Sequence, residues 1–203
     1  TDRGDAVMLN ASTGATVWTH SLGSPVHAMP VIAGERVYAA LEDGRVVALA
    51  LGTGKVAWET RLSGRGTTLY PVGDRVYAGA DDRFFYCLAA DNGKTRWRWP
   101  TGGAIVGTPA VDADHVYFIS RDNVLRALGR SSGHQRWKTA LPMRPTAGPF
   151  LVGGLLLVAG QSVVFDPVPS IGCRPSRDKK IRDRGFSCRG NLPVAWARDG
   201  AFF

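Results

Sequence analysis

The stretch Gly52–Lys55 reads GTGK, which has the residue types of a loop that binds nucleotide phosphates. Such a loop requires the pattern G-x-x-x-x-G-K-[ST], so that backbone N–H groups surround the phosphates and a hydroxyl reaches the magnesium ion. Here Leu49 stands where the first glycine is needed, and Val56 stands where the hydroxyl is needed. The sequence therefore does not predict a nucleotide site at this stretch.

Carboxylates recur at short turns between apolar runs, where they could suggest a calcium site. Calcium takes about six to eight oxygen ligands, whereas a lone aspartate in a turn commonly bonds its own backbone. We therefore interpret these acids as turn formers and predict no metal site. They are Glu42, Asp43, Asp81, Asp82 and Asp122.

Cysteine and histidine also lack the grouping that catalysis or metal binding needs. The three cysteines, Cys87, Cys173 and Cys188, are neither adjacent nor regularly spaced, which argues against a disulfide framework. No spacing requires the four histidines to converge: they are His20, His27, His115 and His134. We predict no catalytic, cofactor-binding or metal-binding residue in this stretch.

One residue pattern does recur along the chain. Four tryptophans follow one another at steps of 40, 39 and 40 residues, and a glycine stands four residues before each. A leucine stands nine residues before each tryptophan. GTGK is therefore one copy of a turn that is used four times. The glycine–tryptophan pairs are Gly14 and Trp18, Gly54 and Trp58, Gly93 and Trp97, and Gly133 and Trp137.

Each repeat reads as four short β-strands. In one unit, residues 27–32, 36–41, 45–50 and 55–60 are apolar or β-branched, and glycine or aspartate separates them. No helical period extends over ten or more residues. Four strands in about 40 residues are typical of a propeller blade. We expect the glycine to occupy a turn with positive φ and the tryptophan to fill the seam between consecutive blades.

This unit resembles the quinoprotein-type (PQQ-like) propeller repeat. That family's docking motif reads A-x-D-x-x-T-G-K-x-x-W, and the four copies here are MLNASTGATVW, ALALGTGKVAW, CLAADNGKTRW and ALGRSSGHQRW. Glycine and tryptophan match in every copy, whereas the usual aspartate is absent from all four. The resemblance covers residues 3–166 and implies an all-β propeller of four-stranded antiparallel blades.

The repeats amount to about four blades, which would make the chain a fragment. Residues 1–166 form the propeller region, and we expect a basic tail at 167–203 that is disordered or aberrant. Four blades cannot complete the seven- or eight-bladed rings that this repeat resembles, so we expect an open arc with unpaired edges. The expected units are a partial blade at 3–20, blades at 27–60, 68–99 and 106–138, and a partial blade at 147–166.

The resemblance implies three classes of function. We predict a non-catalytic scaffold for protein–protein interaction, similar to the lipoprotein subunit of the outer-membrane assembly machine. The first alternative is a fragment of a quinone-dependent alcohol or sugar dehydrogenase, which would use PQQ and calcium. Those enzymes carry a vicinal pair of cysteines, which this stretch lacks. The second alternative is an extracytoplasmic sensor domain of a bacterial signalling protein.

Charge and hydrophobicity indicate which classes of partner the chain can bind. The formal net charge is +8, and residues 166–203 carry half of this excess. The basic residues of the propeller region are scattered over turns and outer strands, so we predict no binding to nucleic acid. The apolar run 150–160 is too short to span a bilayer. We expect a protein partner, with self-association through open blade edges as a further possibility. The resemblance implies an extracytoplasmic location, in the bacterial periplasm or at the outer membrane, although this stretch shows no signal sequence.

Overall fold

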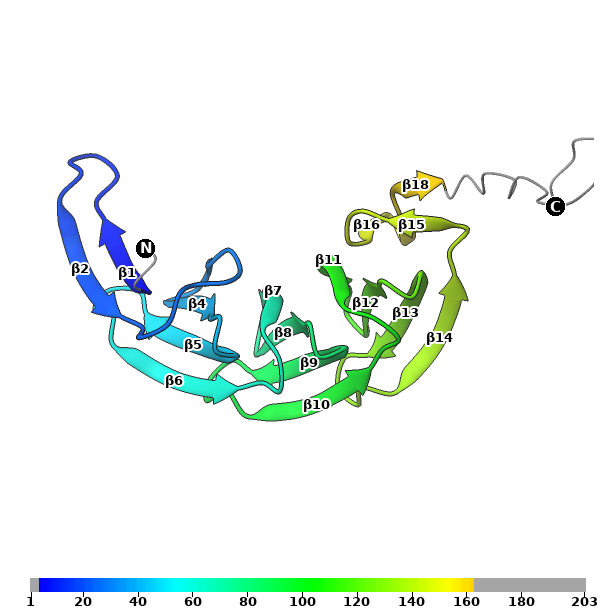
Figure 1. The fold of residues 1–203 in the computed structure, drawn as a ribbon, viewed down its shortest axis with the longest axis horizontal. Coiled ribbons are helices and arrows are strands. Elements are labelled where there is room, and N and C mark those ends of the chain that lie inside the picture. The colour runs from blue at the N-terminus through cyan, green and yellow to red at the C-terminus, as the bar shows by residue number, and fades with distance from the viewer. Residues whose placement is uncertain (1–3, 163–203) are drawn as a thin grey trace, which may run out of the picture. The chain divides into compact units, whose positions relative to one another are not determined.

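In the computed structural model, residues 4–162 can be described, and they form β-strands and turns (Figure 1). Strands β1 (Asp5–Leu9) and β2 (Thr16–Ser21) form a two-stranded sheet. Within the described residues there is no helix that could cross a membrane. The expected tail at 167–203, and residues 163–166 of the last expected blade, lie outside the described residues.

Three four-stranded sheets follow along the chain. The first contains β3 (Val31–Ala33), β4 (Arg36–Ala40), β5 (Arg45–Ala50) and β6 (Val56–Arg61). The second contains β7 (Gly66–Val72), β8 (Arg75–Ala80), β9 (Phe84–Ala89) and β10 (Thr95–Pro100). The third contains β11 (Ile105–Val111), β12 (His115–Ser120), β13 (Val124–Gly129) and β14 (Gln135–Ala140). In each sheet the strands pair antiparallel in chain order, which confirms the predicted all-β class.

The last described strands form two short ladders. β15 (Met143–Pro145) pairs with β18 (Gly160–Ser162), and β16 (Phe150–Val152) pairs with β17 (Leu155–Leu157). Both ladders belong to one hairpin, whose arms are interrupted between Pro145 and Phe150 on one side and between Leu157 and Gly160 on the other. The hairpin therefore corresponds to the first two strands of a blade.

A recurring proline explains these interruptions. In β11, residues 107–109, the last of which is Pro109, lie opposite a single residue of β12, Phe118. Pro30 and Pro149 occupy the same position in their repeats, and there too the ladder is broken. Proline has no N–H to donate to a ladder, so it favours a bulge. Leu69 replaces proline in β7, and that strand has a bulge of a single residue instead.

The hydrophobic core lies between consecutive sheets. Tyr77 and Phe85 of the second four-stranded sheet pack against Phe118 of the third, and the Phe85 and Phe118 rings stack with centroids 4.1 Å apart. Between the first and second sheets, Val46 and Val76 belong to another such cluster. Each sheet thus depends on its neighbours to cover its faces.

The described sheets are not closed into a ring by strand pairing. β1 and β2 pair with each other, and no ladder within residues 4–162 joins them to β15, β16, β17 or β18. This agrees with the predicted unclosed arrangement. The two incomplete sheets therefore leave β-strand edges without a partner in the described part of the chain.

Candidate functional site

Three of the four repeat tryptophans form a seam with the next sheet. The indole Nε1 of Trp18 donates to the Leu51 carbonyl oxygen at 2.7 Å. Trp58 donates in the same way to Ala90 at 2.8 Å, and Trp97 donates to Arg130 at 3.0 Å. Because the acceptors are backbone groups in the same turn of successive repeats, one geometry is repeated three times.

The repeat glycines lie directly beneath these indole rings. Gly54 has φ 67°, and a Cβ placed on it would lie 2.6 Å from Cδ2 of Trp18. Gly133 has φ 68°, and its Cβ would lie 2.7 Å from Cδ2 of Trp97. Gly93 lies against Trp58 in the same manner. Any side chain here would meet both an unfavourable backbone conformation and the ring above it.

The first glycine and the last tryptophan stand outside these pairs. Gly14 has the same backbone conformation, with φ 70°, but nothing lies within 4 Å of a Cβ placed on it. Trp137 is 40% exposed, and β14 that carries it has no buried residue. The structure thus pairs six of the eight predicted residues as tryptophan over glycine, and among the described residues Gly14 and Trp137 have no counterpart of this kind.

Two arginines reinforce the seams, and the sequence analysis did not identify them. Arg36 donates to the Ala90 carbonyl that also receives the Trp58 indole. Arg75 donates at 3.1 Å to Arg130, which likewise receives Trp97. The signal was present as the recurring triplet Arg-Val-Tyr, at residues 36–38 and 75–77.

Substitution of Gly54 by alanine should destabilise the chain more than the same substitution at Gly14. Both residues have positive φ, so each variant loses about 1–2 kcal/mol from the backbone alone. Only Gly54 lies under a tryptophan, so Gly54→Ala should cost about 2 kcal/mol more. Urea unfolding of the two variants measures this difference, and equal losses would contradict a role for the ring contact.

A second set of contacts joins the hairpins and linkers at one end of the sheets, here named the linker face. It comprises the turns 41–44, 81–83 and 121–123 and the linkers 62–65 and 101–104. The carbonyl groups of Gly44, Arg83 and Asn123 accept bonds from the residue that follows the outer strand of the same sheet. These three residues all have positive φ, at 86°, 67° and 58°, which the sequence indicated only for the glycine.

Three aspartates of the linker face accept hydrogen bonds from the backbone of their own turns. Oδ1 of Asp43, Asp82 and Asp122 accepts the backbone N–H two residues later, at 3.1, 2.9 and 3.1 Å. Arg65 also connects two sheets, because it bonds Asp81 at 2.8 Å and Glu42 at 3.1 Å. The geometry therefore agrees with the interpretation as turn formers for Asp43, Asp82 and Asp122, whereas Glu42 and Asp81 bond Arg65 of a neighbouring linker.

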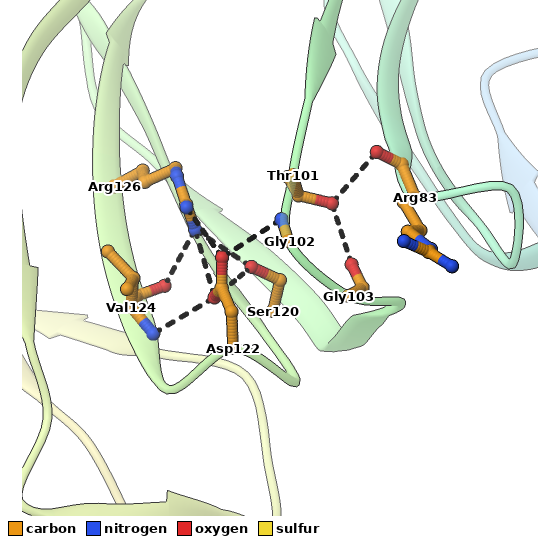
Figure 2. Close-up of polar contacts among 8 residues, drawn as sticks. All are labelled: Arg83, Thr101, Gly102, Gly103, Ser120, Asp122, Val124 and Arg126. Carbon is orange, nitrogen blue, oxygen red and sulfur yellow. Dashed lines mark hydrogen bonds and ion pairs between the residues drawn. The ribbon is translucent and has the colours of Figure 1, made fainter.

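Asp122 is the centre of a polar network that joins a hairpin to the preceding linker (Figure 2). Its Oδ2 accepts from Arg126 at 2.6 Å and from the Gly102 N–H at 3.0 Å, and its Oδ1 accepts from the Ser120 hydroxyl at 2.6 Å. Burial acts to raise the pKa of Asp122, but the bonds from Arg126, Ser120 and Gly102 lower it to about 2. This network fixes the third four-stranded sheet to the linker that precedes it.

The low pKa predicts how stability depends on pH. A carboxyl whose pKa falls on folding contributes stability above its unfolded pKa, and that contribution is lost as the pH falls through the folded value. Asp122→Asn should therefore reduce the free energy of unfolding by about 2 kcal/mol at neutral pH.

The difference from the unmodified chain should shrink between pH 4 and pH 2. Urea unfolding across this range measures it, with Asp91→Asn as a control because Asp91 is exposed. A difference that stays constant with pH would show that the Asp122 carboxylate does not stabilise the fold through its charge.

A hollow of about 550 Å³ lies beside the linker face, here named the arginine hollow. Arg121 and Arg144 line it together with Asn123, Thr146 and Gln161. Both arginines are exposed, and neither forms an ion pair with a carboxylate of the described residues. This contrasts with Arg126, whose charge is compensated by Asp122.

The remaining candidates stay apart within the described residues. His27 contacts Glu42 at 2.6 Å, whereas His115 lies 3.5 Å from Asp112 on another sheet. Cys87 is buried, which raises the pKa of its thiol. Cys173 and Cys188 lie outside the described residues.

The repeated four-stranded sheets and their spacing define a β-propeller chain. The family model described as outer membrane protein assembly factor BamB matches residues 1–72 and 42–167. The chain belongs to this family, which confirms the resemblance to PQQ-like propeller repeats. No curated protein matches the chain.

Solved structures agree on the fold. BamB from Moraxella catarrhalis is 19% identical, with a TM-score of 0.69, and the match covers 78% of this chain and 54% of that one. The computationally designed Ika8 protein is 15% identical, with a TM-score of 0.70, and the match covers 79% and 51%. The chain thus spans about half the length of these propellers. The designed Ika4 protein matches with a TM-score of 0.61.

Proposed function

We propose that this chain is a non-catalytic propeller module that binds a protein partner through its linker face. The observation that supports this most is the arginine hollow, where Arg121 and Arg144 present uncompensated charge around a recess of about 550 Å³. Arg83 adds a further exposed charge on the same face. An acidic segment of a partner protein would be the complementary ligand.

The surroundings of the hollow are held in place by backbone and side-chain contacts. Asn123, in its wall, is held with positive φ by the same turn that Asp122 stabilises. The Leu141 N–H donates to the Asn123 carbonyl at 2.7 Å and fixes the start of the next linker. A surface fixed by such contacts can bind a partner with little loss of conformational freedom.

Membership of the BamB family supports a proposal for where in the cell the chain binds its partner. The family is described by outer membrane protein assembly, and we propose that the chain acts in the periplasm, at the outer membrane, within a protein assembly. The partner would then be another component of that assembly with an acidic surface segment. Arg121 and Arg144 would be the residues that select it.

Site-specific photo-cross-linking tests this proposal. The chain is exported to the periplasm of a Gram-negative bacterium with a photoreactive amino acid in place of Arg83, an exposed residue of the linker face. We expect a discrete adduct with one protein, and we expect the double variant Arg121→Glu, Arg144→Glu to abolish it. The control position is Asn92, which is exposed in an outer turn away from the linker face. Absence of an adduct, or the same adduct from Asn92, would contradict a partner site here.

The alternative of a dehydrogenase fragment has a separate test. The purified chain is incubated with PQQ and calcium, and the cofactor absorbance and the reduction of a dye by alcohols are recorded. A non-catalytic module should show neither a bound cofactor spectrum nor dye reduction. Activity that rises with added PQQ would overturn the proposed function.

A further inference from the structure

The two ends of the described chain carry complementary halves of a four-stranded sheet. β1 and β2 correspond to the third and fourth strands of a blade, because they carry the first copy of the repeat leucine and tryptophan. The β15–β18 hairpin corresponds to the first and second strands, because Leu157 pairs with Phe150 as Tyr117 pairs with Ala110. Within residues 4–162, neither half pairs with the strands that would complete it.

Both halves expose apolar side chains that the complete sheets bury. Leu9 is 53% exposed, whereas Leu49, at the same position of the next repeat, is 1% exposed. Leu157 is 63% exposed, whereas Tyr117 at its position is 8% exposed. In the described chain, the exposed large apolar residues outside these ends are Met29, Ile32 and Val56; those at the ends are Val7, Leu9, Val17, Trp137, Phe150, Val152, Leu155 and Leu157.

The unused tryptophan and the unused glycine are also complementary. Trp137 at one end has the ring but no glycine turn beneath it among the described residues. Gly14 at the other end has the required φ of 70° and open space above it. In the three internal seams, a tryptophan always lies over such a glycine of the following sheet.

We propose that β1 and β2 of one copy of this chain add to the β15–β18 hairpin of a second copy and complete a blade. Trp137 of the second copy then docks over Gly14 of the first, as Trp97 docks over Gly133 within the chain. The arginine hollow shares Arg144 and Gln161 with this hairpin, but the inference rests on the strand edges and on the Trp137–Gly14 pair and does not depend on the proposed function. The contact is head-to-tail, so repeated use produces a closed ring or a growing chain of copies.

The association has the usual driving forces of strand addition. Within residues 4–162, the outer edges of both halves have no paired strand, and pairing them satisfies backbone groups at the same time as it covers apolar side chains. A second copy fits this role because it supplies the third and fourth strands that the hairpin lacks.

The register of the new ladder follows from the repeat. In the third four-stranded sheet, Tyr117 of β12 stands opposite Ala127 of β13. Leu157 takes the place of Tyr117 in the last repeat, and Met8 takes the place of Ala127 in the first. Leu157 of one copy should therefore face Met8 of the other. A slip by one residue would turn the side chains to opposite faces.

Disulfide cross-linking between two different variants tests this register. In a background without Cys87, Cys173 and Cys188, one protein carries Met8→Cys and the other carries Leu157→Cys. Mixing and mild oxidation should produce a covalent heterodimer. The control, Val158→Cys mixed with Met8→Cys, should produce far less because its side chain lies on the other face. Equal yields, or no heterodimer, would contradict the composite blade.

A double variant separates association from closure within one chain. A protein with both Met8→Cys and Leu157→Cys should form covalent dimers or larger species under mild oxidation. If the bond formed only within single chains, the ring would close on itself and the inference would be wrong. If residues 163–203 supplied the missing strands instead, no bond would form, and the inference would be equally wrong.

Light scattering of the unmodified chain gives a second readout. The mass should rise with concentration, and Gly14→Ala should weaken this association at least tenfold because its Cβ would meet the incoming Trp137. Met29→Ala, which removes an apolar side chain that is 84% exposed away from both ends, should leave the association unchanged. A mass that is independent of concentration, or an effect of Met29→Ala equal to that of Gly14→Ala, would overturn the proposal.

Discussion

The contact between a tryptophan and the glycine turn of the next sheet is the interaction on which the rest of the structure depends. Each four-stranded sheet has a face that it cannot cover by itself, so stability requires the next sheet in the correct position. The indole ring supplies apolar surface, and its N–H donates a hydrogen bond to a backbone carbonyl of the next sheet. The glycine is needed because the ring lies where a Cβ would stand.

The linker face also fixes the positions of the sheets, through contacts between hairpins and linkers at one end of them. There, Asp122 and Arg126 are both largely buried, and their charges compensate each other. The resulting network holds the linker at Gly102 against the next hairpin. Because these polar groups already serve the fold, the side chains left for a partner are the exposed arginines, including Arg121 and Arg144.

The sequence was sufficient to predict the fold class because the repeat is strongly marked. The spacing of glycine and tryptophan set the period, and the turn residues divided each period into four strands, as the structure confirms for the three complete sheets. Backbone details were not predictable in the same way. The acceptors Leu51, Ala90 and Arg130 bond through carbonyl groups, which carry no side-chain signature.

At the candidate site too, the sequence pattern predicts the motif but not the surroundings of each copy. Trp97 and Trp137 belong to equivalent motifs, yet within the described residues only Trp97 of these two lies over a glycine turn, because the surroundings of a residue depend on which sheet follows. The positive φ of Arg83 was equally hidden, since arginine gives no indication of it. The arginine hollow combines residues from β11, a hairpin and the last described strands, which are distant in sequence.

Hydrogen exchange of the indole N–H groups, followed by NMR in a dilute sample, tests the central claim most directly. We expect slow exchange for Trp18, Trp58 and Trp97, because each indole N–H bonds a carbonyl of the next sheet. Trp137 should exchange rapidly at low protein concentration, since its ring has no such partner among the described residues. Equal exchange rates for all four indoles would contradict the claim that these contacts hold consecutive sheets together.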